Sequence, residues 1–241
     1  MAFTGARPAP PTRPVHQTPN KETRMKLPGT EKAVPAFSHA LLTLALLASC
    51  TFARADAEAD FVRGREAYRL NDVAGAMEPL KKAADAGHGA AQALYGAILD
   101  SAELDDEALP YLQKSAGQGD MDGQYGLAKM YFTGEAQAPD PADAGRLMRA
   151  AASKGHRLAI VTLALAYIRG DRRLDADHPD SAEAREMLTQ AAEIGEVDAM
   201  KAVAQGYRSG KFGFPADGTK ADQWDARVAA ILGTGKRGAR K

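Results

Sequence analysis

The sequence is short of several residue types, and each shortage excludes a class of protein. It has one cysteine, Cys50, so neither an intramolecular disulfide nor a cluster of thiolate metal ligands can form. Aromatic residues make up only 6% of the 241 residues, whereas alanine is abundant. This composition favours closely packed helices over a β-sandwich, because alanine is the residue that a helix accommodates at least cost. The formal net charge is zero, so we expect no nucleic-acid partner.

Motifs for catalysis and for metal binding are also missing. The sequence contains no H-E-x-x-H, no G-x-S-x-G and no S-x-x-K with its companion motifs. His88 and His156 each follow a glycine that is expected to end a helix, and they are interpreted as turn residues rather than as ligands of one metal. We therefore predict no catalytic residue, no cofactor and no metal site, and the protein is not expected to be an enzyme.

Two further patterns have a structural interpretation. The letters GTGKRG at 233–238 match G-x-G-x-x-G, but they follow a helical pattern instead of a strand, and a dinucleotide site needs strand, turn and helix together. We interpret them as a helix cap followed by a basic tail. The consecutive carboxylates Asp105, Asp106 and Glu107 open an expected helix, where negative charge stabilises the N-terminus.

The first 55 residues have the layout of an extension followed by a secretory signal peptide. Residues 1–24 are rich in proline, threonine and arginine without an apolar period, and Met25 is the natural start of the following unit. That unit has a basic beginning, an apolar stretch from Ala40 to Phe52 and an exit of small residues. The apolar stretch is too short to cross a bilayer comfortably as a mature helix.

The segment contains two alternative signal-peptide cleavage sites. The letters ARA at 53–55 form an A-x-A site, and cleavage there, before Asp56, is the favoured prediction. The letters LASC at 47–50 resemble a bacterial lipobox, which would leave Cys50 as a lipidated N-terminus and the only contact with a membrane. An uncleaved anchor is a third alternative. Each alternative places the remainder outside the cytoplasm, in the periplasm or, with lipidation, as an outer-membrane lipoprotein.

Two signatures recur along the rest of the chain. Tyr-x-x-Gly occurs at 131–134, 167–170 and 207–210, and two small residues followed by x-x-Gly occur five times. The glycines of the second signature are 87, 119, 155, 195 and 233, and the first four define intervals of 32, 36 and 40 residues. The tyrosine follows the glycine by 12 residues in three repeats. Such constant spacing predicts a helical repeat.

Each recurring position has a physical role in a helix pair. Glycine suits the left-handed conformation that ends a helix, and the tyrosine one turn earlier packs between neighbouring pairs. These repeat residues are Gly87, Gly119, Tyr131, Gly134, Gly155, Tyr167, Gly170, Gly195, Tyr207 and Gly210. The first helix of each pair is expected to begin near Ala91, Gly123, Ala159 and Ala199, and the helix that ends at Gly195 is expected to have Asp180 or Ser181 as its N-cap. Asn71 replaces the loop glycine in the first repeat, and Leu99 and Ala102 replace tyrosine and glycine in the second.

These residues resemble the Sel-1-like repeat, a longer relative of the tetratricopeptide repeat. The segments 123–155 and 199–233 follow the family pattern A-x-x-x-L-G-x-x-Y-x-x-G, loop, and second helix, and the resemblance covers about residues 56–233. The family's Trp-Tyr pair is missing from the second helices, with only Trp224 near its place. The resemblance implies an all-α fold, a right-handed α-solenoid of four to five helix-turn-helix repeats. The chain is therefore expected to divide into residues 1–55, a repeat domain at 56–235 and a flexible basic tail at 236–241.

The resemblance also implies a function as an adaptor or scaffold that binds an unidentified protein or peptide in the cell envelope. In the tetratricopeptide register, the variable groove positions lie one residue before the start of each first helix and two, six, nine and ten residues after it. Of these positions in repeats three to five, ten are predicted to line the groove: Tyr125, Lys129, Phe132, Val161, Leu165, Ile168, Arg169, Lys201, Gln205 and Arg208. The segment IVTLALAYI at 160–168 is equally consistent with a buried central helix. The alternative functions are an envelope enzyme, such as a weak β-lactamase or a cell-wall hydrolase, and a purely structural or oligomerising solenoid.

Overall fold

The structure is a computed structural model that describes residues 54–138, 140, 142–174, 176 and 178–238. The expected signal peptide lies outside these residues, as do Met25 and Cys50, except that Arg54 and Ala55 begin the first described helix. Among the described residues, none of the helices combines the length and the apolar character that crossing a membrane requires.

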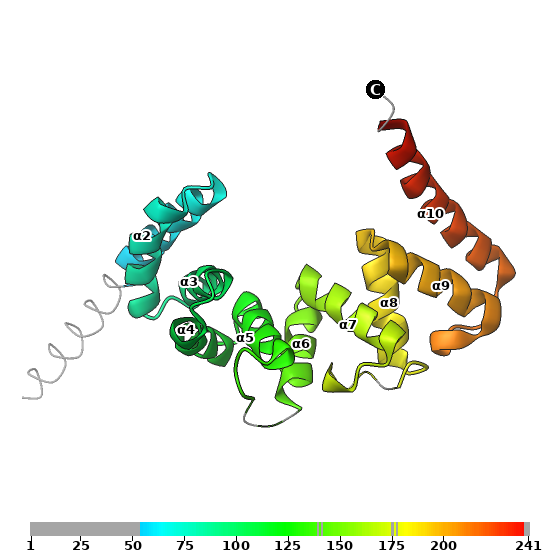
Figure 1. Cartoon of the computed structure of the whole chain (residues 1–241), viewed down its shortest axis with the longest axis horizontal. Helices are drawn as coiled ribbons and strands as arrows, with labels where there is room; N and C mark the ends of the chain where they lie inside the picture. Colours follow the sequence, from blue (N-terminus) through cyan, green and yellow to red (C-terminus); the bar gives the residue numbers. More distant parts are fainter. Residues whose placement is uncertain (1–53, 139, 141, 175, 177, 239–241) are drawn as a thin grey trace, which may run out of the picture. The chain divides into compact units, whose positions relative to one another are not determined.

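Regular structure is helical throughout the described residues (Figure 1). A helix over residues 54–69 precedes the labelled elements. These are α2 (Val73–Asp85), α3 (Gly89–Ser101), α4 (Asp105–Gly117), α5 (Met121–Thr133), α6 (Asp143–Ser153), α7 (Arg157–Arg169), η1 (Arg172–Leu174), α8 (Ala182–Ile194), α9 (Val197–Ser209), η2 (Lys211–Gly213) and α10 (Gly218–Gly238). The order gives five pairs in the described part of the chain, each with a first and a second helix.

The helices pack mainly on their neighbours in sequence. From α2 to α10 each α-helix contacts the next, and the first helices α3 and α5, and α7 and α9, also contact each other. Contacts limited to adjacent repeats are the defining property of a solenoid. The expected all-α helical repeat solenoid is therefore confirmed.

One core position recurs on the second helices as a large, fully buried apolar residue. Leu80, Leu112, Met148 and Leu188 occupy equivalent positions of four second helices, and all are at most 1% exposed. A Cβ added at Gly96 of α3 would lie 2.8 Å from the Leu112 Cγ, so the α3 backbone lies directly on this side chain. Small residues at such contacts let the helix axes approach closely, as the alanine content predicted.

The helix ends follow the repeat signature. Seven of the eight glycines that the sequence assigns to helix ends have positive φ, between 67° and 106°, and Asn71 has φ 62°. In the second repeat Ala102 has φ −94°, and the next residue, Glu103, takes the left-handed conformation at φ 61°. The chain thus makes the same turn without glycine, one residue later than in the other repeats.

The first helices begin two residues earlier than expected. Their N-caps are the residues directly after the turn glycines, namely His88, Asp120, His156 and Glu196. The expected starts Ala91, Gly123 and Ala159 are instead third residues of their helices, and their amides donate to the capping side chains. Ser181 caps α8, with its Oγ accepting from the Ala184 amide at 3.0 Å.

The C-terminal helix is longer than the sequence predicted. Gly233 was expected to end a helix and residues 236–241 to form a flexible tail, but α10 continues through Gly233 to Gly238. In the other repeats a left-handed glycine allows the chain to reverse into the next helix. No helix follows α10 within the described residues, so Gly233 need not make such a turn.

Candidate functional site

Side chains of the first helices enclose a groove of about 490 Å³ at the N-terminal repeats. Its lining comes from the helix at 54–69, from α3, from α5 and from the beginning of α7. The lining residues are Phe61, Arg65, Tyr68, Ala90, Ala93, Leu94, Ala97, Asp100, Ser101, Asp122, Tyr125, Gly126, Lys129, His156 and Leu158. We call this the N-terminal groove. Tyr68 and Leu158 are 43% and 55% exposed, so large apolar side chains are accessible in it.

His156 lines the N-terminal groove and connects α7 to α5. Its Nδ1 accepts from the Ala159 amide at 3.1 Å, and its ring stacks on Tyr125 with 4.4 Å between the ring centroids. Its Nε2 lies 3.2 Å from the Asp122 carboxylate. Because Nδ1 accepts a hydrogen bond, the proton of the neutral ring is on Nε2, which donates to Asp122. This hydrogen bond holds the pKa of Asp122 below its usual value.

The same arrangement occurs two repeats earlier. His88 caps α3 through Nδ1, stacks on Phe61 with 4.5 Å between centroids, and has its Nε2 2.9 Å from Glu58. In both cases an acidic residue and an aromatic residue three positions later lie on the preceding first helix. We call this arrangement, in which a capping histidine contacts an acidic and an aromatic residue of the preceding first helix, a histidine clamp. The interpretation of both histidines as turn residues did not predict it. The signal was present as an acid-x-x-aromatic pattern two repeats apart.

Replacing His156 with alanine is expected to lower the free energy of unfolding by about 2 kcal/mol, because it removes an N-cap and a stacked ring together. His156→Asn keeps a good capping side chain and loses the stack, so about 1 kcal/mol is expected for it. Urea denaturation followed by circular dichroism measures both values. Equal losses for the two variants would contradict a capping role for His156.

Lys129 and Asp100 form an ion pair at the other end of the N-terminal groove. The Lys129 Nζ lies 2.6 Å from the Asp100 Oδ2 and 3.8 Å from the Glu135 Oε2. Burial alone would lower the pKa of Lys129, but the hydrogen bond to Asp100 and the two carboxylate charges outweigh it, and the pKa lies above its usual value. Lys129 is therefore a cation held by carboxylates.

The ten residues predicted to line a groove occupy several environments. Tyr125 and Lys129 line the N-terminal groove. A separate hollow of about 260 Å³ is lined by Leu165, Ile168, Arg169, Lys201 and Gln205, together with Asp198, Ala202 and Phe212.

The other three predicted residues make contacts elsewhere. Phe132 lies under the Arg173 guanidinium, 4.3 Å from its carbon, and Val161 is partly buried against the core. Arg208 pairs with Asp225 at 2.6 Å and Asp222 at 3.4 Å.

The sequence could have indicated the rest of the N-terminal groove. The first repeat interval is 32 residues, so the expected helix start Ala91 corresponds to Ala59 in the first repeat. The positions two, six and nine residues later are then Phe61, Arg65 and Tyr68, and all three line the groove. The prediction from the sequence names groove positions only in repeats three to five and therefore omits these three residues.

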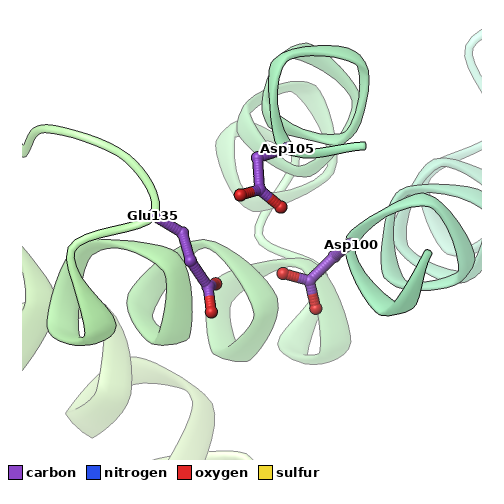
Figure 2. Close-up of side chains that lie close together, drawn as sticks. All are labelled: Asp100, Asp105 and Glu135. Carbon is purple, nitrogen blue, oxygen red and sulfur yellow. The ribbon is translucent and has the colours of Figure 1, made fainter. Parts of the chain in front are cut away.

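A second cluster brings three carboxylates together. Oxygen atoms of Asp100, Asp105 and Glu135 lie within 4.8 Å of one another (Figure 2). We call these residues the carboxylate cluster. Asp105 was interpreted only as a charge at a helix start, and the structure adds a contact with residues from the ends of two other helices. Glu103, Asp106 and Glu107 line an adjoining hollow of about 370 Å³ with Asp105 and Glu135.

Comparisons with known proteins identify similar solved structures. No protein-family model matches the chain, and no curated protein matches it. A Sel1 repeat protein from Oxalobacter formigenes is 27% identical with a TM-score of 0.55, over 65% of this chain and 45% of that one. The protein c5321, a protective antigen present in uropathogenic Escherichia coli strains that displays an SLR fold, is 24% identical with a TM-score of 0.55, over 71% of this chain and 38% of that one.

A Sel1 repeat protein from Klebsiella pneumoniae subsp. pneumoniae is 22% identical with a TM-score of 0.51, and the match covers 77% of this chain and 92% of that one. The matched region is less than half of the length of the first two structures.

Proposed function

We propose that this chain, a Sel-1-like repeat protein in its fold, is a non-catalytic scaffold that binds a segment of a partner protein in the N-terminal groove. The observation that supports the proposal is the groove itself, which is lined by the first helices of four successive repeats. Repeat proteins of this architecture use such extended surfaces for binding. The sequence layout of residues 25–55 supports the cell envelope as the place of action.

The chemistry of the groove favours an apolar segment over a small polar substrate. Asp122 is engaged by His156, and Asp100 is engaged by Lys129, so these charged groups already have partners within the protein. The exposed side chains of Tyr68 and Leu158 line the groove and remain available for contact. Arg65 lies 5.1 Å from the centre of the Phe61 ring and adds positive charge. We expect the bound segment to present an apolar or aromatic side chain next to an acidic residue.

Ala97 offers a way to block the groove without disturbing the core, because it lines the groove and is exposed. The tagged chain would be cross-linked in the envelope of its host, and the captured protein purified for a binding titration. Ala97→Arg is expected to weaken binding by about tenfold or more, because an arginine would occupy the groove. Ala226→Arg, at an exposed position in the middle of α10, makes the same change away from the groove and should leave binding unchanged. Equal binding by wild type and Ala97→Arg would refute the groove as the binding site.

A further inference from the structure

The carboxylate cluster is assembled from three separate parts of the chain. Asp100 is the penultimate residue of α3, Asp105 is the first residue of α4, and Glu135 follows the glycine that ends α5. Figure 2 shows the three side chains facing a common space. Two of the three residues lie at the C-terminal ends of helices, where the helix dipole attracts positive charge.

Asp100 provides an independent indication of a ligand. Its side chain is only 9% exposed, and its Oδ2 accepts from Lys129 at 2.6 Å. Its Oδ1 is buried and has no hydrogen-bond partner among the described residues. Leaving a buried acceptor unsatisfied is unfavourable, particularly for a charged group. The nearby side chains Asp105 and Glu135 are carboxylates, and an ionised carboxylate cannot donate to Oδ1. A cation between the three side chains would satisfy all of them.

The surroundings add negative charge and access to solvent. Five acidic residues line the adjoining hollow, namely Glu103, Asp105, Asp106, Glu107 and Glu135. Lys129 contributes one positive charge, which it shares between Asp100 and Glu135. The carboxylates therefore outnumber the ammonium that faces them. A bound ion could complete its coordination with water from the hollow.

We propose that the carboxylate cluster binds a divalent cation of the hard, oxygen-preferring class, with Ca²⁺ as the preferred ion. Ca²⁺ takes oxygen ligands at roughly 2.3–2.6 Å in flexible geometry, so it can join oxygens that lie up to about 5 Å apart. The spacing within 4.8 Å meets that requirement. Mg²⁺ demands a tighter octahedron and gives up water reluctantly, which favours Ca²⁺ at an irregular set of carboxylates. This inference does not depend on the proposed scaffold function.

Lys129 has a defined part in this proposal. Its ammonium and the cation compete for the same two carboxylates, Asp100 and Glu135. Replacing Lys129 with methionine removes the competitor and takes away the ammonium that contacts the Asp100 Oδ2. Lys129→Met should therefore bind Ca²⁺ more tightly than wild type, and Ca²⁺ should raise its melting temperature by more than it raises that of wild type.

Isothermal titration of the purified chain with CaCl₂, after removal of metal, tests the site. We expect saturable binding that MgCl₂ reproduces only weakly. Asp105→Asn should weaken Ca²⁺ binding by about tenfold or more, because a charged carboxylate ligand becomes a neutral amide. Asp106→Asn makes the same charge change at the adjacent exposed residue and should have less than about a twofold effect. Should Asp105→Asn fail to fold, Glu135→Gln replaces it, because Glu135 follows α5 and is not part of any helix.

Three results would overturn the proposal. The first is the absence of saturable heat with Ca²⁺. The second is an equal loss of binding in Asp105→Asn and Asp106→Asn, which would indicate diffuse attraction by surface charge. The third is a Lys129→Met variant that Ca²⁺ does not stabilise, which would leave Asp100 and Lys129 as an ordinary ion pair.

Discussion

Leu112→Ala is expected to lower the free energy of unfolding by about 3 kcal/mol, because it opens a cavity between three helices. Leu112 lies on α4 and is 1% exposed. Its side chain is in contact with the backbones of two first helices, since a Cβ added at either Gly96 of α3 or Gly126 of α5 would lie 2.8 Å from it. The surrounding backbone is helical and cannot collapse easily into the cavity. Urea denaturation with linear extrapolation gives the value.

A double-mutant cycle with Gly96 makes this prediction specific. In the wild-type background, Gly96→Ala places a methyl group 2.8 Å from the Leu112 Cγ and 3.0 Å from its Cδ2, and overpacking should cost about 1–3 kcal/mol. In the Leu112→Ala background the same methyl enters the cavity, and alanine also favours the helix by about 1 kcal/mol. The double variant should therefore be more stable than the sum of the two single losses predicts. Additive losses would contradict direct contact between the two positions.

Gly123→Ala is expected to cost about 3 kcal/mol, because its new Cβ meets atoms that cannot move aside. The Cβ would lie 2.2 Å from the Ser115 Oγ, 2.5 Å from the Ser115 Cβ and 2.9 Å from the Ala116 amide nitrogen. Ser115 is fully buried, and its Oγ donates to the Gly89 carbonyl at 2.9 Å. Relief of the clash must therefore separate α5 from α4 or break the hydrogen bond that joins α4 to the start of α3.

Gly117 provides the matched control for this substitution. It is the last residue of α4, and a Cβ added there meets nothing within 4 Å. Gly117→Ala should leave stability unchanged or raise it by up to about 1 kcal/mol, through the better helix propensity of alanine. The same denaturation measurement compares the two variants. A loss at Gly117 as large as the loss at Gly123 would show that helical glycine in general, and not the close approach of α4 and α5, determines the effect.

The architecture could be predicted from the sequence because its determinants are local and recur at regular intervals. A turn glycine needs only a left-handed conformation, so its spacing shows where helices end. The same reasoning predicts the helix starts two residues late, because the spacing does not show that the residue directly after each turn glycine is the N-cap, as His88 and His156 are. A histidine cap needs a suitable ring orientation, which here depends on an aromatic residue in the preceding repeat.

The carboxylate cluster was beyond the reach of sequence reasoning for a different reason. Asp100 and Glu135 are 35 residues apart, and the turn between α3 and α4 contains the non-glycine left-handed residue Glu103. From the sequence, Asp105 is therefore grouped only with its two acidic neighbours, Asp106 and Glu107. The stacking of the second repeat on the third brings the cluster together, and the left-handed glycine that ends α5 places Glu135 directly after it.

Two kinds of junction between repeats alternate along the solenoid, one with a histidine N-cap and one with an acidic N-cap. His88 and His156 are 68 residues apart, and acidic caps, Asp120 and Glu196, stand at the junctions that follow them. A histidine junction needs an acid and an aromatic on the helix before it, whereas an acidic junction does not. A version of this chain that gained or lost a single repeat would place a histidine against a helix without its partners. Growth or shortening of the array in steps of two repeats would keep every junction intact.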